Sequence, residues 1–142
     1  MRPGSMAIAI SELDEERRNV IKLIELLEIR PLYSIASDYF LNRFAAVRAA
    51  IEGFMAREET FLRECQVPEE TICLHIADHE RIRTILHRIH QNAINKKNQT
   101  ALDVHAHLKT EVERHASRFG FEMSKRIQRS EKAFTFNVVE TN

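Results

Sequence analysis

Residues 38–65 read DYFLNRFAAVRAAIEGFMAREETFLREC, and this stretch decides the fold class. Its apolar residues recur in steps of four and three, the spacing that places side chains on one face of an α-helix. The members of this face are Phe40, Phe44, Val47, Ile51, Phe54, Glu58, Phe61 and Cys65. One of them, Glu58, carries a carboxylate where an apolar seam needs none. The stretch therefore predicts a long amphipathic helix with an acidic residue on its core face.

Three further segments have the same kind of apolar stripe. We expect helices over residues 11–30, 68–94 and 100–129. Ser11 suits an N-cap, and Pro31 stops the first of these helices. Four helices of about two dozen residues, joined by short turns, predict an all-α protein that folds as an up-down-up-down antiparallel four-helix bundle.

The bundle is expected to span residues 10–130 as the single domain of this 142-residue chain. Residues 1–9 are predicted to lie outside it, because MRPGSM resembles an added linker before a native start; a disordered natural terminus would read the same way. Residues 131–142 are predicted to form a C-terminal tail, either a strap across the bundle or a frayed end.

Composition excludes several classes of function. Lys plus Arg equals Asp plus Glu at 21 each, so the chain has no basic field for nucleic acid. Its apolar runs are far shorter than the roughly 20 residues that a membrane span needs. We therefore expect a soluble, cytoplasmic protein with neither a nucleic-acid nor a membrane partner. Its two cysteines, Cys65 and Cys73, are expected to be free thiols.

A histidine pair stands on the core face of the third predicted helix. His75 and His79 share the phase of the apolar residues Ile72, Ile76 and Ile82. Two imidazoles one turn apart project toward one point, and neutral histidine is a common metal ligand. The pair predicts a buried metal site, although such a pair is more often exposed or simply hydrogen-bonded.

Depth along the bundle axis indicates which polar stripe residues can meet. In antiparallel neighbours, residues equidistant from the shared turn lie at one level. Glu58 lies nine residues before the turn near residue 67, and His75 lies eight after it. His79 and His115 each lie 18 residues from the turn near residue 97. Convergence of these four side chains favours a metal site with His75, His79, His115 and Glu58 as ligands.

Taken together, these residues resemble the hemerythrin-like family, four-helix bundles that hold a carboxylate-bridged di-iron centre and bind O2. The resemblance covers residues from about 10 to 123. It lies in the order and spacing of four segments, none of them specific alone: ISELDEER at 10–17, FMAREE at 54–59, HIADH at 75–79 and HASRFG at 115–120. The resemblance implies the same fold and a site between the helices.

Departures from the family pattern fall in one half of the site. Arg17 and Phe54 stand where the family has the two histidines of one iron, and Gly120 stands in place of a carboxylate. The histidines of the other iron are matched, and Glu58 matches a bridging carboxylate, with Glu59 as the fallback. The resemblance therefore implies a degenerate site with one iron per chain rather than two, bordered by Arg17, Phe54 and Glu59. By ligand type, Fe(II), Zn(II) and Mn(II) suit it about equally.

Two functions from different classes follow. The first is a mononuclear non-heme iron protein that binds or senses O2 or NO through open positions on the metal, without being an enzyme. The alternative is a metal-free bundle in which an Arg17–Glu58 ion pair replaces the metal. Such a bundle would dock a signalling partner or a second copy of the chain. Heme ligation by two of the seven histidines is a third, weaker hypothesis.

Overall fold

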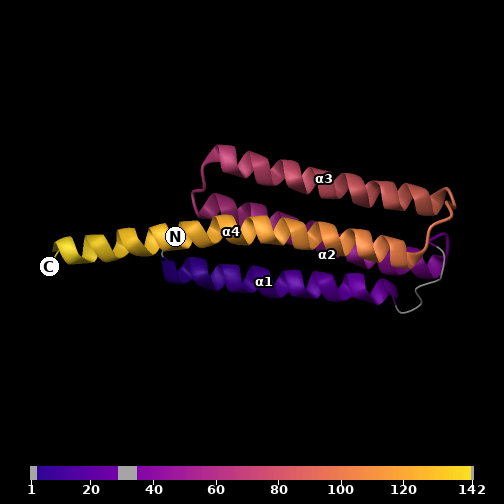
Figure 1. The fold of residues 1–142 in the computed structure, drawn as a ribbon, viewed down its shortest axis with the longest axis horizontal. Coiled ribbons are helices and arrows are strands. Elements are labelled where there is room, and N and C mark those ends of the chain that lie inside the picture. The colour runs from indigo at the N-terminus through magenta and orange to yellow at the C-terminus, as the bar shows by residue number, and fades with distance from the viewer. Residues whose placement is uncertain (1–2, 29–34, 142) are drawn as a thin grey trace.

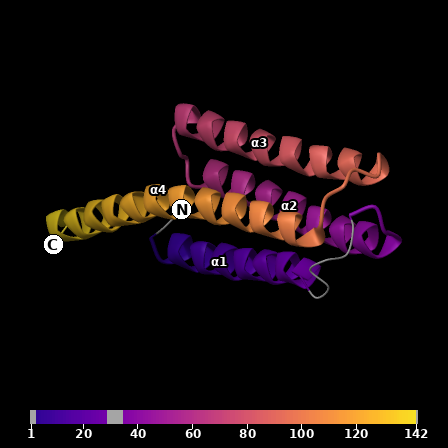
Figure 2. The same cartoon turned by 45° about the vertical axis from the view of Figure 1, so that its right-hand side comes forward.

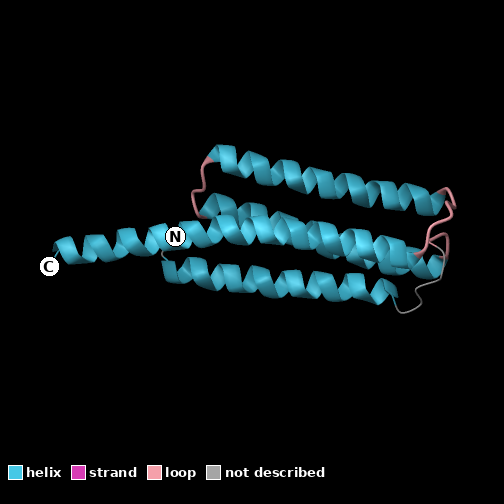
Figure 3. Ribbon diagram, viewed as in Figure 1, coloured by secondary structure: helices cyan, strands magenta, loops and turns pink. Residues whose placement is uncertain are grey.

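The computed structural model describes residues 3–28 and 35–141, and this part of the chain is helical without strands (Figures 1 and 3). Its four long helices are α1 (Pro3–Glu25), α2 (Asp38–Glu64), α3 (Glu69–Ile94) and α4 (Ala101–Thr141). A single 3₁₀ turn, η1 (Leu26–Glu28), continues α1.

The helices form the expected four-helix bundle. α1 packs against α2 and α4, and α3 packs against the same two helices, so sequence neighbours are also neighbours in space (Figures 1 and 2). Residues 35–37, just before α2, lie at the same end as the α3–α4 loop, since the backbone N–H of Ile35 donates to the carbonyl of Gln99 at 3.2 Å. The predicted all-α class and antiparallel topology are thus confirmed.

Local chemistry sets the helix starts. Ser37 caps α2, because its hydroxyl oxygen accepts from the backbone N–H of Phe40 at 3.1 Å. A reciprocal pair begins α4: the backbone N–H of Thr100 donates to the Asp103 carboxylate at 3.1 Å, while the Thr100 hydroxyl oxygen accepts from the N–H of Asp103 at 3.3 Å. Pro68 is the N-cap residue of α3, so this helix begins one residue after its predicted start at 68.

The core is built from the predicted stripes. The α2 face is buried over its whole length: Phe40, Phe44, Val47, Ile51, Phe54, Glu58, Phe61 and Cys65. Large apolar side chains therefore surround the level at which Glu58 lies, and water is largely kept from it. Within residues 3–28 and 35–141, each helix is too polar or too short to cross a lipid bilayer.

Both ends of the chain differ from the prediction. Residues 3–9, expected outside the fold, belong to α1, and Met6 is buried there. Proline suits a first helical position, so Pro3 helps the helix to start early. α4 continues through the predicted tail to Thr141 and projects past the other helices (Figure 1), because no Gly or Pro follows Gly120. The predicted stop at Pro31 lies outside the described residues.

Candidate metal centre

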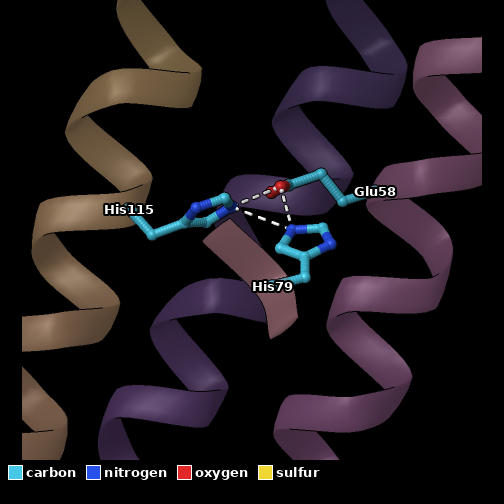
Figure 4. A group of neighbouring side chains, drawn as sticks. All are labelled: Glu58, His79 and His115. Carbon is cyan, nitrogen blue, oxygen red and sulfur yellow. Dashed lines mark hydrogen bonds and ion pairs between the residues drawn. The ribbon is translucent and has the colours of Figure 1, made fainter. Parts of the chain in front are cut away.

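Three side chains from three helices converge in the core (Figure 4). Oε1 of Glu58 on α2 lies 2.8 Å from Nε2 of His79 on α3 and 2.5 Å from Nε2 of His115 on α4. The two Nε2 atoms are 3.1 Å apart. Glu58 and His79 have no exposed surface, and His115 has 2%. These three residues, which we call the triad, form a buried group able to hold a metal ion.

The outer nitrogen of each imidazole meets a carboxylate. Nδ1 of His79 donates to Oε2 of Glu59 at 3.0 Å. Nδ1 of His115 donates to Oδ2 of Asp78. Arg114 then donates to the other Asp78 oxygen at 2.7 Å. Histidines that bind metals are typically held in this way, because the carboxylate fixes the tautomer and the orientation of the ring.

These outer contacts determine what the inner atoms can do. A carboxylate only accepts, and each ring lies between an outer carboxylate and Glu58, so a neutral ring can donate to only one of the two. In the tautomer whose Nδ1 donates to the outer carboxylate, Nε2 is a bare lone pair. Two such lone pairs and Oε1 of Glu58 face one another within 3.1 Å. Among the described residues, the second oxygen of Glu58 is buried and has no hydrogen-bond partner. Acceptors brought this close repel one another unless a cation lies between them, either a metal ion or added protons.

The charges around the triad shift its pKa values. Burial alone raises the pKa of Glu58, but hydrogen bonds from His115 and His79 outweigh it, so the pKa is lowered. Burial lowers the pKa of His115, yet Glu58 and Asp78 raise it above its usual value. Burial raises the pKa of Asp78, whereas Arg114 and His115 bring it down to about 2. Without metal, the centre therefore favours a protonated His115 between two carboxylates.

The dimensions of the triad suit a metal ion. Four ligands at about 2.0–2.1 Å from a tetrahedral ion lie about 3.3 Å from one another. The three inner atoms lie 2.5–3.1 Å apart, so movements of less than about 1 Å would open the centre to that size. Imidazole nitrogen and carboxylate oxygen are the donors that Fe(II), Zn(II) and Mn(II) accept.

His75, the fourth predicted ligand, lies outside the triad. It is 7% exposed, and its ring centre is 5.9 Å from that of His115 and 5.6 Å from that of Phe119, edge to face in both cases. Burial is the main reason that its pKa is lowered. His75 is therefore a neutral ring packed beside the centre, one helical turn from His79.

Of the residues predicted to border the site, two are placed in or beside the core and one is not. Glu59 lies beside it through its hydrogen bond to His79, and Phe54 is buried in the core. The proposed Arg17–Glu58 ion pair is absent from the described residues. Arg17 is partly exposed and pairs instead with Asp14, one turn earlier on α1, at 3.7 Å. Its distance along the helix was suitable, but its side chain extends along the surface of α1 and not toward the centre.

Sequence reasoning gave no role to Asp78 or Arg114. Asp78 precedes a stripe histidine by one residue, which turns it by about 100° toward the neighbouring helix. That offset was the available signal, since it directs a carboxylate at α4, where His115 and Arg114 lie.

Comparison with known proteins adds no relative. The chain matches no protein-family model, no curated protein and no solved structure. The resemblance to the hemerythrin-like family therefore stays a prediction from the residues, and functional inference rests on the geometry of the triad.

Proposed function

We propose that this protein binds one divalent transition-metal ion through Glu58, His79 and His115. The observation that carries the proposal is the convergence of two imidazole Nε2 atoms and a carboxylate oxygen within 3.1 Å, each ring oriented by an outer carboxylate. A metal ion relieves the repulsion between these acceptors and uses the orientation that the outer carboxylates impose.

Fe(II) is the metal that we propose first. Two histidines and one carboxylate with open positions are the ligand set typical of mononuclear non-heme iron sites. Three protein ligands leave room on the ion for a small molecule, and we infer that O2 or NO occupies it. Because the ligands come from α2, α3 and α4, a change at the metal would be felt by three helices at once, which suits a sensor.

One observation favours a metal-free alternative. The three triad residues contact one another directly. The raised pKa of His115 favours an imidazolium that pairs with both Glu58 and Asp78. In that case the buried charges are already compensated, and the bundle is a helical interaction module. Arg17 has no part in this version, because its partner is Asp14.

Metal content decides between the two. The wild-type protein is reconstituted anaerobically with Fe(II), desalted and measured by plasma mass spectrometry beside His79→Ala and the control His87→Ala, an exposed histidine of α3. We expect about one iron per chain in the wild type and the control, and none in His79→Ala. If the wild type binds neither Fe(II) nor another divalent transition metal, the metal site is wrong and the metal-free module remains. NO added to the iron-loaded protein should give the electron paramagnetic resonance signal of a ferrous nitrosyl.

A further inference from the structure

A pocket opens between α3 and α4 beside the triad. It has a volume of about 250 Å³, and its lining includes Leu74, His75, Asp78, His115, Arg118 and Glu122. His115 is the one triad member in this lining. A ligand in the pocket therefore has a triad imidazole as one wall and solvent on its outer side. Drug-sized ligands occupy pockets of roughly 300–1,000 Å³, so this one suits a smaller molecule.

The cation of this pocket is Arg118. Its Nη1 lies 3.7 Å from Oδ1 of Asp78, beyond hydrogen-bonding distance, and 60% of the side chain is exposed. Asp78 is already neutralised by Arg114 at 2.7 Å and bonded by His115. The guanidinium of Arg118 therefore has donors to offer to a ligand. A guanidinium fork matches the two oxygens of a carboxylate.

The proposed metal centre itself calls for an anion. A divalent ion bound by Glu58 and two neutral imidazoles has a net charge of plus one. Asp78 is paired with Arg114, whereas Arg83 is shared by Glu52, Glu80 and Glu59, so Glu59 offsets part of this charge. A buried excess charge is costly, and an anion in the pocket beside His115 would offset the rest.

We propose that the pocket binds a small monocarboxylate of the size of formate or acetate, attracted by Arg118 on the solvent side and by the metal on the core side. This inference rests on the proposed metal site and adds a second class of ligand to it. Glu122 also lines the pocket, so a second negative charge on the ligand would be repelled. The pocket thus selects monoanions over dicarboxylates.

The test uses Co(II) as a coloured stand-in for iron, and acetate as the probe. After cobalt content is measured, acetate is titrated into the loaded wild type, and the visible spectrum gives Kd. We expect saturable binding that weakens about five- to tenfold in Arg118→Gln and tightens in Glu122→Gln. Leu74→Trp, which fills the pocket from its exposed rim, should weaken binding. Arg88→Gln, an exposed arginine three turns along α3 from the pocket, should match the wild type.

The outcomes separate the two proposals. If cobalt binds one per chain but acetate leaves the spectrum unchanged, or if Arg118→Gln and Glu122→Gln bind acetate like the wild type, the monocarboxylate site is wrong and the metal site stands. If cobalt does not bind at all, the metal site fails and the pocket proposal fails with it. Malonate binding as tightly as acetate would contradict the selection against a second charge.

Discussion

The Nε2 atoms of His79 and His115 lie 3.1 Å apart in the core, although a carboxylate holds the opposite nitrogen of each ring. Two neutral rings oriented in this way present lone pairs to each other, and Oε1 of Glu58 adds a third acceptor. The centre is therefore built for a cation.

His75→Ala should retain about one metal ion per chain with an affinity within about threefold of the wild type, because His75 lies outside the triad. The substitution leaves a cavity, so thermal stability should fall, by roughly 1–3 kcal/mol for a truncated buried side chain. Metal content per chain and competition with a chelator compare metal binding in the variant and in the wild type. A loss as complete as in His79→Ala would show that His75 joins the metal as a third imidazole.

Asp78→Asn should weaken metal binding 10- to 100-fold, in the range typical for a carboxylate that orients a ligating histidine. The amide oxygen can still accept a hydrogen bond from Nδ1 of His115. It lacks the negative charge of the carboxylate, which makes the imidazole a stronger ligand for the metal. Competition with a chromophoric chelator gives the ratio of affinities. Asp14→Asn is the control, since that carboxylate pairs with Arg17 on α1. Equal affinities in the two variants would rule out a role for the Asp78 charge.

The metal-free protein should be most stable between about pH 4.5 and 6.5. The pKa of His115 is raised above 6.5, so its contribution is complete below that pH and is lost as the pH rises through the folded-state value. The pKa of Glu58 is lowered from 4.5, so its contribution is lost as the pH falls below 4.5. Asp78, shifted from 3.8 to about 2, adds roughly 2 kcal/mol that disappears on acidification over that range.

Urea unfolding across this pH range measures the profile, and His115→Gln should flatten its alkaline side. With metal in excess, the alkaline slope should reverse, because ligation requires deprotonated imidazoles and strengthens as the pH rises. A profile that is the same with and without metal would mean that no metal reaches the triad.

Arg17→Met should leave metal content unchanged and alter the free energy of unfolding by less than about 0.5 kcal/mol, as usual for a partly exposed pair. If Arg17 instead neutralised Glu58 in the core, removing it would cost about 3–5 kcal/mol. Chemical denaturation of the metal-free protein distinguishes these values, and Arg18→Met, an exposed neighbour, controls for the loss of one surface charge.

Counting residues from the turns placed His79 level with His115, and these two rings do meet, because the helix rise is constant and the α3–α4 turn is short. The same counting placed Glu58 level with His75, whereas Glu58 meets His79, one helical turn deeper. The same counting could not separate His75 from His79. Four residues advance a helix by one turn plus about 40°, and that small rotation with a rise of about 6 Å places His75 at the pocket wall.

Arg17 shows a different limit of the sequence argument. A long side chain reaches several partners from one helical position, and the sequence does not reveal which one it takes. The outer carboxylates were hidden for a related reason. Asp78 belongs to no stripe, so periodicity gives it no function, although its offset directs it at the next helix.

Two pairs of consecutive residues also fix how the helices are aligned. On α2, Glu58 faces the centre while Glu59 reaches the imidazole of α3; on α3, His79 faces the centre while Asp78 reaches the imidazole of α4. Sliding either helix by one residue would exchange the members of a pair and break both contacts. Apolar stripes tolerate several such alignments, but these pairs do not. The polar contacts of the centre therefore specify one register of α2, α3 and α4, whether or not a metal is bound.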